Sequence, residues 1–207
     1  MRYQKMTAKI IIATGNQGKV NEFKELFSGI DVSLTSLKDH WNPLPEIEEN
    51  GSTFYENAKI KADWVYERSG GVWALADDSG LEVDALNGAP GVLSARFSGE
   101  AATSESNNEK LLNALKDTPE HLRTARFKCV LVLKVNHETY LSAEGACEGA
   151  IITKKIGSGG FGYDPLFIPQ GFNETFAQLT SEEINKISHR GAAMRTLYKE
   201  LDLLFFR

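Results

Sequence analysis

The sequence predicts an α/β protein with a single mixed sheet and two lobes around a central cleft, and three observations support this fold class. The β-branched run at residues 9–13 is followed by a turn with glycine and then by an amphipathic helix. Helical stripes and strand-like runs then alternate along the chain. Two strand-like segments, 123–135 and 139–153, lie close enough in sequence to pair as an antiparallel hairpin, so the sheet should be mixed.

The length and composition set limits on the class of protein. The 207 residues suffice for one large domain or two small lobes, and we expect residues 1–8 to be a leader and residues 9–207 to form one domain. A net charge of −5 argues against a mainly electrostatic grip on nucleic acid. A local positive pocket for a small anionic ligand is still compatible with that charge.

Targeting signals and cysteine usage favour the cytoplasm. No apolar run approaches the length of a membrane span, and the apolar run at residues 10–13 is too short for a signal peptide. Cys129 and Cys147 lie in apolar, strand-like contexts without the spacing of metal ligands. We therefore expect buried free thiols in a reducing compartment and no membrane partner.

The first segment with functional character is the turn at residues 14–19, between the first strand and its helix. The helix is indicated by Val20, Phe23 and Phe27, which share one face. A strand–turn–helix aims backbone N–H groups at a ligand, and Lys19 adds positive charge, so the segment could bind phosphate. Its spacing does not match a Walker A loop. An ordinary strand-to-helix turn is the alternative.

A second helix is predicted from Thr53, which begins a capping box with Glu56, to about Arg68. It follows an acidic loop at residues 46–49, and most such loops are simply solvated. Its apolar stripe also places Lys61 on the inward face. Because a buried ammonium needs a partner, Lys61 either reaches the edge of the core or points into a cleft that holds anions.

The pair Asp77 and Asp78 is predicted to follow a short strand that begins near Gly71. Adjacent carboxylates repel each other unless a positive group lies beside them, and a Mg²⁺ ion is the simplest such group. The alternative is a turn, because Asp-Asp-Ser-Gly consists of residues that turns favour.

Further helices are predicted by capping boxes at Ser106–Glu109 and Thr180–Glu183. Between them, Asn136-His137 reads as a two-residue hairpin turn that joins two long strands. After the last box, Met194, Leu197 and Leu201 mark a final helix.

A glycine-rich loop at residues 157–165 includes Phe161 and Tyr163. Glycines let backbone approach a ligand closely, and aromatic rings can stack on a base, so ligand binding is favoured over a plain linker. His189 and Arg190 lie at the start of the final helix and offer hydrogen-bond donors. A polar ligand is favoured for them, and a structural histidine is the alternative.

Four motifs occur in order along the chain: Thr14-Gly15-Asn16-x-Gly18-Lys19, Asp77-Asp78-Ser79-Gly80-Leu81, Phe161-Gly162-Tyr163-Asp164-Pro165 and Ser188-His189-Arg190. Together they resemble the inosine/xanthosine triphosphate pyrophosphatase family, and the match extends from Lys9 onwards. Each motif alone is weak, but the set is specific. The resemblance implies the ITPase-like fold, a homodimer, and Mg²⁺-dependent hydrolysis of ITP, dITP and XTP to the monophosphate and pyrophosphate.

The resemblance also assigns roles to residues. It implies that Glu49, Asp77 and Asp78 hold Mg²⁺, that Asp78 is the base for the attacking water, and that Lys61 acts on the phosphates. The implied substrate-binding residues are Thr14, Gly15, Asn16, Gln17, Gly18, Lys19, Ser79, Phe161, Gly162, Tyr163, Asp164, His189 and Arg190. Donors on the histidine and the arginine would pair with an oxo group at C6 of the purine, whereas an amine there would oppose them with another donor.

One position departs from the family pattern. The family usually has a lysine five residues before the histidine, where this chain has Ile184. The nearest lysine, Lys186, lies about 200° away around a helix and cannot replace it without a change of backbone. One substrate contact is therefore in question.

Two other functions remain as alternatives. The first is a pyrophosphatase for modified pyrimidine nucleotides on the same fold. The Phe161 loop and the His189-Arg190 pair argue against it, because they favour a purine with an oxo group at C6. The second is a nucleotide-binding module without catalysis. Such a module would not need the carboxylate pair Asp77-Asp78 together with the acidic loop at residues 46–49.

Overall fold

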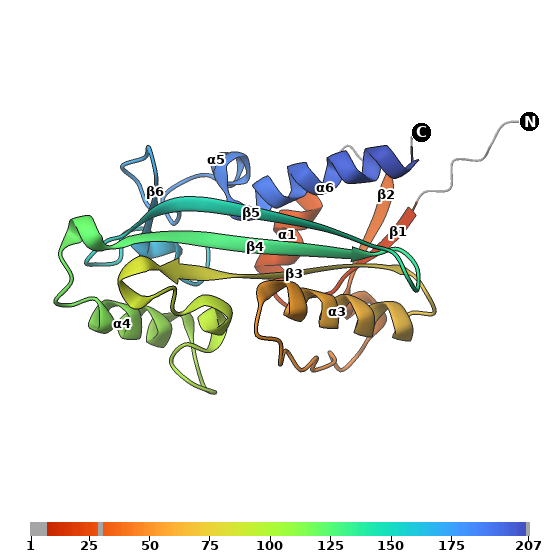
Figure 1. Cartoon of the computed structure of the whole chain (residues 1–207), viewed down its shortest axis with the longest axis horizontal. Helices are drawn as coiled ribbons and strands as arrows, with labels where there is room; N and C mark the ends of the chain where they lie inside the picture. Colours follow the sequence, from red (N-terminus) through yellow and green to blue (C-terminus); the bar gives the residue numbers. More distant parts are fainter. Residues whose placement is uncertain (1–7, 29–30, 206–207) are drawn as a thin grey trace, which may run out of the picture. The chain divides into compact units, whose positions relative to one another are not determined.

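The computed structural model describes residues 8–28 and 31–205, so nearly all of the expected leader lies outside the described residues (Figure 1). The strands are β1 (Ala8–Ile12), β2 (Val32–Ser36), β3 (Trp73–Val83), β4 (Thr124–Lys134), β5 (Tyr140–Ile151) and β6 (Phe167–Pro169). The α-helices are α1 (Gln17–Leu26), α2 (Leu37–His40), α3 (Phe54–Arg68), α4 (Ser104–Ala114), α5 (Ser181–Ile187) and α6 (His189–Phe205). None of the described helices is long and apolar enough to cross a membrane.

The described strands form one six-stranded sheet in the order β2-β1-β3-β4-β5-β6. Strand β1 pairs in parallel with both β2 and β3, while β5 pairs antiparallel with β6. The connection between β4 and β5 is too short for a parallel crossover, so these neighbours form a hairpin. The prediction of a mixed α/β sheet is confirmed.

The chain divides into two compact units. The first unit comprises Met1–Asp77, Leu131–Ala143 and Leu197–Arg207, and the second comprises Asp78–Val130 and Glu144–Thr196. The long strands β3, β4 and β5 each contribute residues to both units.

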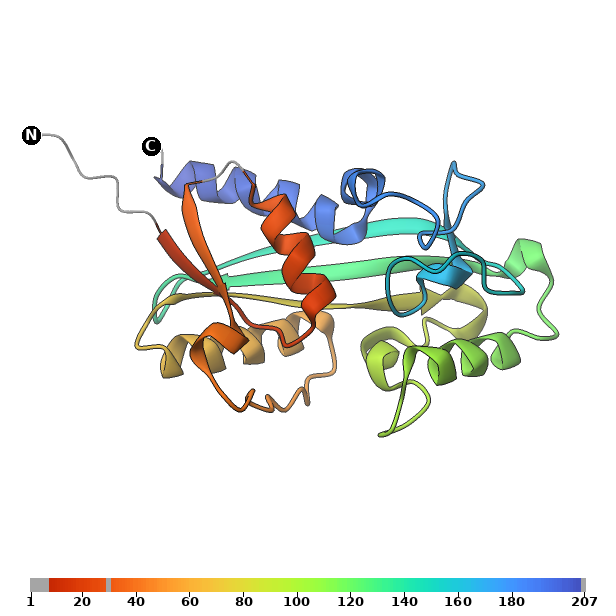
Figure 2. The same ribbon diagram turned by 180° about the vertical axis from the view of Figure 1, so that it is seen from behind.

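The core of the first unit is built from the predicted strand–turn–helix and from α3. The isoleucines of β1 are completely buried, as expected for a strand covered on both faces. Helix α1, visible in Figure 2, buries Val20 and Phe23. Helix α3 buries Ala58, Ala62 and Val65 and is capped by Thr53 and Glu56 as predicted. Its inward stripe matches the predicted period.

The core of the second unit is a cluster of buried aromatic and aliphatic side chains. Leu111 of α4 belongs to this cluster, as do Leu81 of β3 and Phe127 of β4. The ring of Phe127 lies 4.8 Å from that of Phe167 and 5.8 Å from that of Phe176, measured between centroids. Burying one such side chain contributes about 1.5–3 kcal/mol, so this cluster fixes the frame on which the loops of the unit rest.

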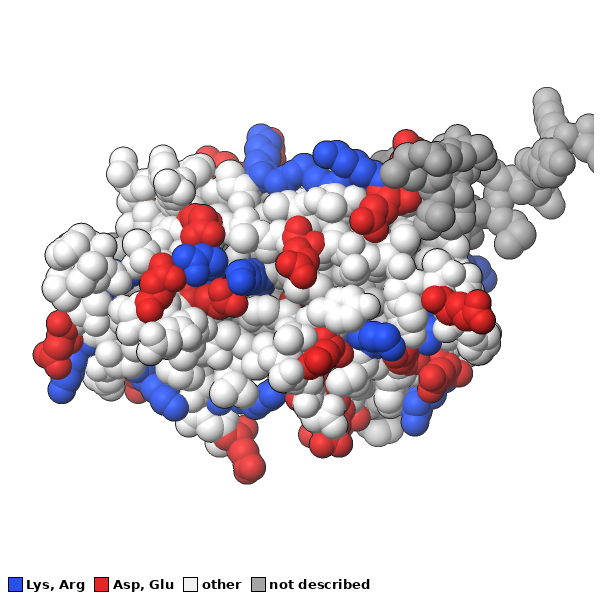
Figure 3. Space-filling view, viewed as in Figure 1, with Lys and Arg blue, Asp and Glu red and all other residues white. Residues whose placement is uncertain are grey.

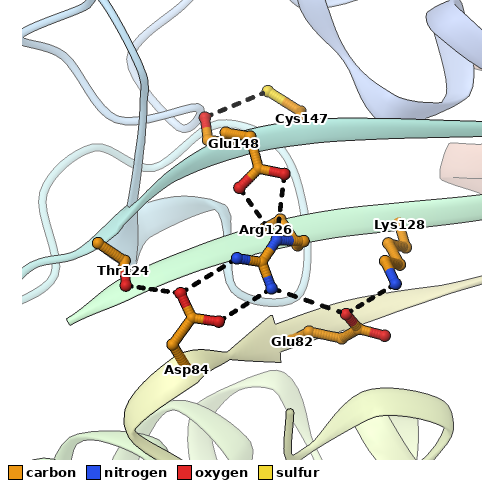
Figure 4. A network of polar contacts seen from close by, with 7 residues as sticks. All are labelled: Glu82, Asp84, Thr124, Arg126, Lys128, Cys147 and Glu148. Atoms are coloured by element: carbon orange, nitrogen blue, oxygen red, sulfur yellow. Dashed lines mark hydrogen bonds and ion pairs between the residues drawn. The ribbon is translucent and has the colours of Figure 1, made fainter. Parts of the chain in front are cut away.

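A network of charged side chains covers part of the second unit (Figures 3 and 4). The Arg126 guanidinium lies 2.9 Å from Asp84 and 3.0 Å from Glu148, and Lys128 lies 3.0 Å from Glu82. Hydrogen bonds from Arg126 and Thr124 lower the pKa of the Asp84 carboxyl. Because these side chains are partly exposed, the ion pairs of the network make only a small contribution to stability.

The prediction that Asp77 and Asp78 follow the end of a short strand is wrong. Strand β3 continues through both residues to Val83, with most of its positions buried. Hydrogen bonding to neighbouring strands has overridden the turn propensity of Asp-Asp-Ser-Gly.

Two other local predictions were also wrong. Helix α4 is capped by Thr103, with Ser106 as the reciprocal partner, instead of by Ser106 with Glu109. The hairpin loop spans five residues instead of two. It is shaped by the Asn136 side chain, which accepts hydrogen bonds from the N–H groups of Glu138 and Thr139. The third box, Thr180 with Glu183, is confirmed at α5.

Candidate active site

In the first unit, the turn at residues 14–19 leads from β1 into the N-terminus of α1. The Asn16 side-chain oxygen caps this helix by accepting hydrogen bonds from the N–H groups of Gly18 and Lys19 at 2.9 and 3.3 Å. Thr14 accepts a hydrogen bond from the Asn16 N–H. Gly15, Asn16 and Gln17 are exposed. The turn thus presents polar groups to solvent at the positive end of a helix dipole.

Lys19 and Asp77 form a buried ion pair in the first unit. The ammonium lies 2.8 Å from the carboxylate, and the side chains are 15% and 0% exposed. Lys19 is the third residue of α1, and Asp77 lies on β3. A cation is unfavourable at a helix N-terminus, so the carboxylate compensates for both the charge and the burial of Lys19.

Glu49 and Lys61 form a second ion pair in the first unit, 2.7 Å apart. The Lys61 side chain is 8% exposed, which confirms its predicted inward direction, and that of Glu49 is 32% exposed. The loop that carries Glu49 is fixed to α3, because the Gly51 N–H donates to the Asn57 side-chain oxygen at 2.8 Å. Asn57 was missed as a functional support, although its inward position on the helix was a signal.

The start of α3 fixes the same loop from the other side. The Glu56 carboxylate accepts hydrogen bonds from the Ser52 hydroxyl and from the N–H groups of Ser52 and Thr53. The hydrogen bonds from Ser52 and then Thr53 lower the pKa of Glu56. The capping box therefore stabilises the helix and also orders the segment that follows Glu49.

In the second unit, Asp78 and Ser79 lie on β3 beside the start of α6. Asp78 is buried, and its carboxylate accepts a hydrogen bond from the Ser79 N–H at 3.0 Å. The Arg190 guanidinium donates to the Ser79 hydroxyl at 3.2 Å. The structure thus brings together two of the predicted substrate-binding residues that lie more than a hundred positions apart in sequence.

His189 is held by an aromatic contact in the second unit. Its ring stacks on Phe127 with centroids 5.0 Å apart and planes 16° apart. The preceding Ser188 is completely buried, and its hydroxyl accepts a hydrogen bond from the Gly191 N–H. These contacts hold His189 and Arg190 in place at the N-terminus of α6. Phe127 was missed, because its sequence context marks only a strand.

The glycine-rich loop of the second unit is shaped by Asp164. Its carboxylate accepts a hydrogen bond from the Phe161 N–H at 2.8 Å. A Cβ atom on Gly160 would lie 2.1 Å from the same carboxylate, so only glycine fits there. Phe161 itself is 41% exposed and is available for stacking. A cavity of about 330 Å³ beside the loop is lined by Phe161, Asn108 and Lys155 among others.

Buried polar groups outside this loop hold it in place, and Asn108 and Ser94, which supply them, were not singled out by the sequence. The Asn108 side chain donates to the Gly162 carbonyl at 3.1 Å. The Tyr163 hydroxyl donates to the Ser94 carbonyl at 2.8 Å, and Asn107 donates to that carbonyl at 3.3 Å. Burial raises the pKa of the Tyr163 phenol, so its hydroxyl keeps the proton that it donates.

The position where the family pattern expects a lysine has an apolar role. Ile184 packs against the core cluster of the second unit. Lys186 is exposed and pairs with Glu182 at 2.7 Å, one helical turn earlier. Lys186 therefore does not take the place of the absent lysine, as the helical angle predicted.

The oxygen donors of the predicted metal site suit a hard divalent cation, because they are all carboxylates. Within residues 8–28 and 31–205, however, no group of three or more His, Cys, Asp or Glu side chains is arranged to hold a metal ion. Glu49 and Asp77 each lie against a lysine instead. The metal roles of Glu49, Asp77 and Asp78 thus stay predictions.

Comparison with known proteins places the chain in a family. Residues 10–200 match the model of the Ham1 family. A dITP/XTP pyrophosphatase from Desulforamulus reducens is 47% identical over 95% of this chain and 97% of its own. Another from Exiguobacterium sibiricum is 49% identical over 91% and 94% of the two chains.

Solved structures agree with the sequence relatives. The Ham1 protein of Staphylococcus aureus has a TM-score of 0.82 at 41% identity, covering 94% of this chain and 98% of its own. A HAM1 protein from Coxiella burnetii has a TM-score of 0.84 at 40% identity, with the same coverage of both chains. With the family model matched over nearly the whole chain, this protein belongs to the Ham1 family.

Proposed function

We propose that this protein hydrolyses non-standard purine nucleoside triphosphates, namely ITP, dITP and XTP, to the monophosphate and pyrophosphate. The observation that carries the proposal is the identity of 44–49% to relatives named dITP/XTP pyrophosphatase over more than nine-tenths of the chain. Removal of deaminated purines from the nucleotide pool is the proposed role.

The first unit supplies the proposed phosphate-binding residues. Residues 14–19 offer the N-terminus of α1, at which anions are stabilised. Lys19 and Lys61 are held in place by Asp77 and Glu49, so they can meet the phosphates with little loss of side-chain entropy. Two fixed ammonium groups would stabilise the charge that develops on the leaving pyrophosphate.

The proposed base is Asp78, which accepts the proton of the water that attacks the α-phosphorus. Glu49 and Asp78 would hold the divalent cation, which we propose to be Mg²⁺. When bound, such a cation neutralises phosphate charge and lowers the pKa of coordinated water. The partial exposure of Glu49 supports its role, because a ligand arriving from solvent can reach its carboxylate.

The second unit supplies the proposed recognition of the purine. Phe161 would stack on the base, and Gly162, Tyr163 and Asp164 would hold the loop around it. His189 and Arg190 would donate to an oxo group at C6. The buried position of Arg190 and its contact with Ser79 support this role, because a fixed donor discriminates strongly between an acceptor and another donor.

We further propose a cytoplasmic homodimer. Cys129 and Cys147 are both buried, which agrees with a reducing compartment, and burial raises the pKa of Cys147 to about 11. The dimer rests on the resemblance to the family, and light scattering after gel filtration tests it.

The experiment that tests the reaction uses water enriched in ¹⁸O. With ITP and Mg²⁺, attack at the α-phosphorus places the label in IMP and leaves the released pyrophosphate unlabelled. Label in the pyrophosphate, or release of inorganic phosphate, would contradict the proposed reaction. The same measurement without a divalent cation should show no turnover.

A further inference from the structure

That Asp77 and Asp78 are neighbours in sequence does not make them a chelating pair. Strand β3 is continuous from Trp73 to Val83, so both residues have extended backbone. Consecutive side chains of a strand point to opposite faces of the sheet. Asp77 and Asp78 therefore project in different directions, and each needs its own explanation.

The partner of Asp77 follows from the topology of the first unit. In the parallel pairing of β1 with β3, Ile12 lies opposite Leu75, and the Ala13 N–H donates to the Leu75 carbonyl at 2.8 Å. Asp77 lies two residues beyond Leu75, on the same face of β3. At that level the chain has left β1 and entered α1, so Asp77 meets the first turn of the helix, where Lys19 lies.

We propose that Asp77 is a positioning residue for Lys19 and binds neither metal nor substrate. This inference rests on the proposed function, in which Lys19 contacts the triphosphate. The carboxylate holds the ammonium at the N-terminus of α1, where the helix dipole alone would repel it. It thereby limits the rotamers of a flexible side chain, and the phosphates meet a group that is already in place.

The test separates this role from that of a metal ligand by measuring binding without turnover. Inorganic pyrophosphate and Mn²⁺ are titrated separately into the wild type and into the variants Asp77→Asn, Lys19→Met and Asp78→Asn. We expect Asp77→Asn and Lys19→Met each to weaken pyrophosphate binding by about tenfold, the scale of one charge-assisted contact, and to leave Mn²⁺ affinity unchanged. Asp78→Asn should lose Mn²⁺ affinity.

A double variant makes the inference independent of how well Asp77→Asn folds. Asp77→Asn with Lys19→Met removes both charges, so no buried charge is left alone. If Asp77 acts through Lys19, the double variant binds pyrophosphate as Lys19→Met does. A further tenfold loss of pyrophosphate or Mn²⁺ affinity in the double variant would overturn the inference, as would wild-type pyrophosphate binding by Asp77→Asn.

The first unit offers a matched control in Asp63 of α3, whose carboxylate forms an ion pair with the buried Lys134 at 2.5 Å. Asp63→Asn breaks a comparable Asp–Lys pair outside the proposed site, so it should leave pyrophosphate binding unchanged. A tenfold loss there would show that any broken ion pair weakens binding, and would overturn the inference. Failure of the proposed function is distinguishable, because it would show as absent ITP turnover in the wild type.

Discussion

Several buried charged residues in this protein are held in place by polar partners. Lys61 and Lys19 are both largely buried and both lie against a carboxylate. Arg190 is almost completely buried and donates to Ser79. Because an isolated buried cation is costly, these contacts fix the side chains before any ligand arrives.

Replacing Asp78 by asparagine should abolish turnover without loss of the fold. Asparagine keeps the shape of the side chain but cannot accept the proton, so kcat should fall at least about 100-fold, the usual contribution of a general base. The measurement is steady-state release of pyrophosphate from ITP, with thermal unfolding as the check on the fold.

The control for that variant is Asp84→Asn, which removes a carboxylate of the same unit from the exposed Arg126 network. Its kcat should stay within about twofold of the wild type, because exposed ion pairs contribute little. Near-normal activity of Asp78→Asn would contradict the assignment of the base.

The sequence predicted part of this residue-scale picture. The direction of Lys61 followed from its place in the apolar stripe of α3, and the need for a partner followed from its burial. The identity of that partner could not be predicted from the sequence, because Glu49 lies in a loop without periodicity. The contact between Asp77 and Lys19 could not be predicted either, because it depends on the pairing of β1 with β3.

At the scale of elements, the predicted site depends on loops that are held by buried polar side chains. The glycine-rich loop is bound to Asn108 and Ser94 through Gly162 and Tyr163. The loop before α3 is bound to Asn57. Asn108 and Ser94 are far from the glycine-rich loop in sequence, so no local pattern could reveal them, whereas Asn57 lies close to Gly51 and its inward position on α3 was a signal.

The glycine-rich loop should tolerate alanine at one glycine better than at another. Gly160 and Gly162 both have positive φ angles, +70° and +61°, so alanine is strained at either position by roughly 1–2 kcal/mol. Only at Gly160 would the new methyl group also meet the Asp164 carboxylate. Gly160→Ala should therefore raise the KM for ITP clearly more than Gly162→Ala. Equal KM values would show that the contact with Asp164 does not shape the binding loop.

Helix α3 is joined to the β4–β5 hairpin by a charged cluster whose stability should depend on pH. Burial alone would raise the pKa of Asp63, but hydrogen bonds from Lys134, Lys59 and Tyr140 outweigh it and hold the pKa below the usual range. A lowered pKa gives stability that is present above the unfolded value of about 4 and is lost as the pH falls further.

Asp63→Asn tests that dependence. It should lower the free energy of unfolding by about 2 kcal/mol at pH 7, where the charge-assisted hydrogen bonds are complete. The difference from the wild type should shrink below about pH 4, where the carboxyl of the unfolded wild type begins to take up a proton that the folded state still excludes. Urea unfolding of the wild type and of Asp63→Asn at pH 7 and below about pH 4 measures this difference in the free energy of unfolding. A difference that is constant with pH would rule out the ionised carboxylate as the cause.

Local signals predicted elements well only where a single interpretation was available. The β-branched run of β1, the stripe of α1 and the capping box of α3 each had one interpretation, and all three are confirmed. The start of α4 was predicted too late in the chain, because its capping pair is Thr103 with Ser106, which lacks the Glu or Gln of the usual capping pattern. Strand β3 was missed in part because its residues favour a turn, and only its neighbours in the sheet keep them extended.

At the scale of the whole molecule, the fold class follows from the alternation of strand and helix patterns and the family from the order of four motifs, while the division into two compact units comes from the structure. The proposed phosphate-binding residues lie mainly in the first unit and the proposed base-binding residues in the second. Ile184 shows the limit of the resemblance, because at the family's lysine position this chain has a partly buried isoleucine that packs against a core.

Substrate choice tests the central claim most directly. Pyrophosphate release is measured in parallel from ITP, XTP, dITP and ATP, with and without Mg²⁺. If His189 and Arg190 donate to an oxo group at C6, as proposed, they reject an amine there, so kcat/KM for ITP, XTP and dITP should exceed that for ATP at least about 100-fold, and only with the cation present. Equal kcat/KM for ATP and ITP, or no release of pyrophosphate from any of the four, would contradict it.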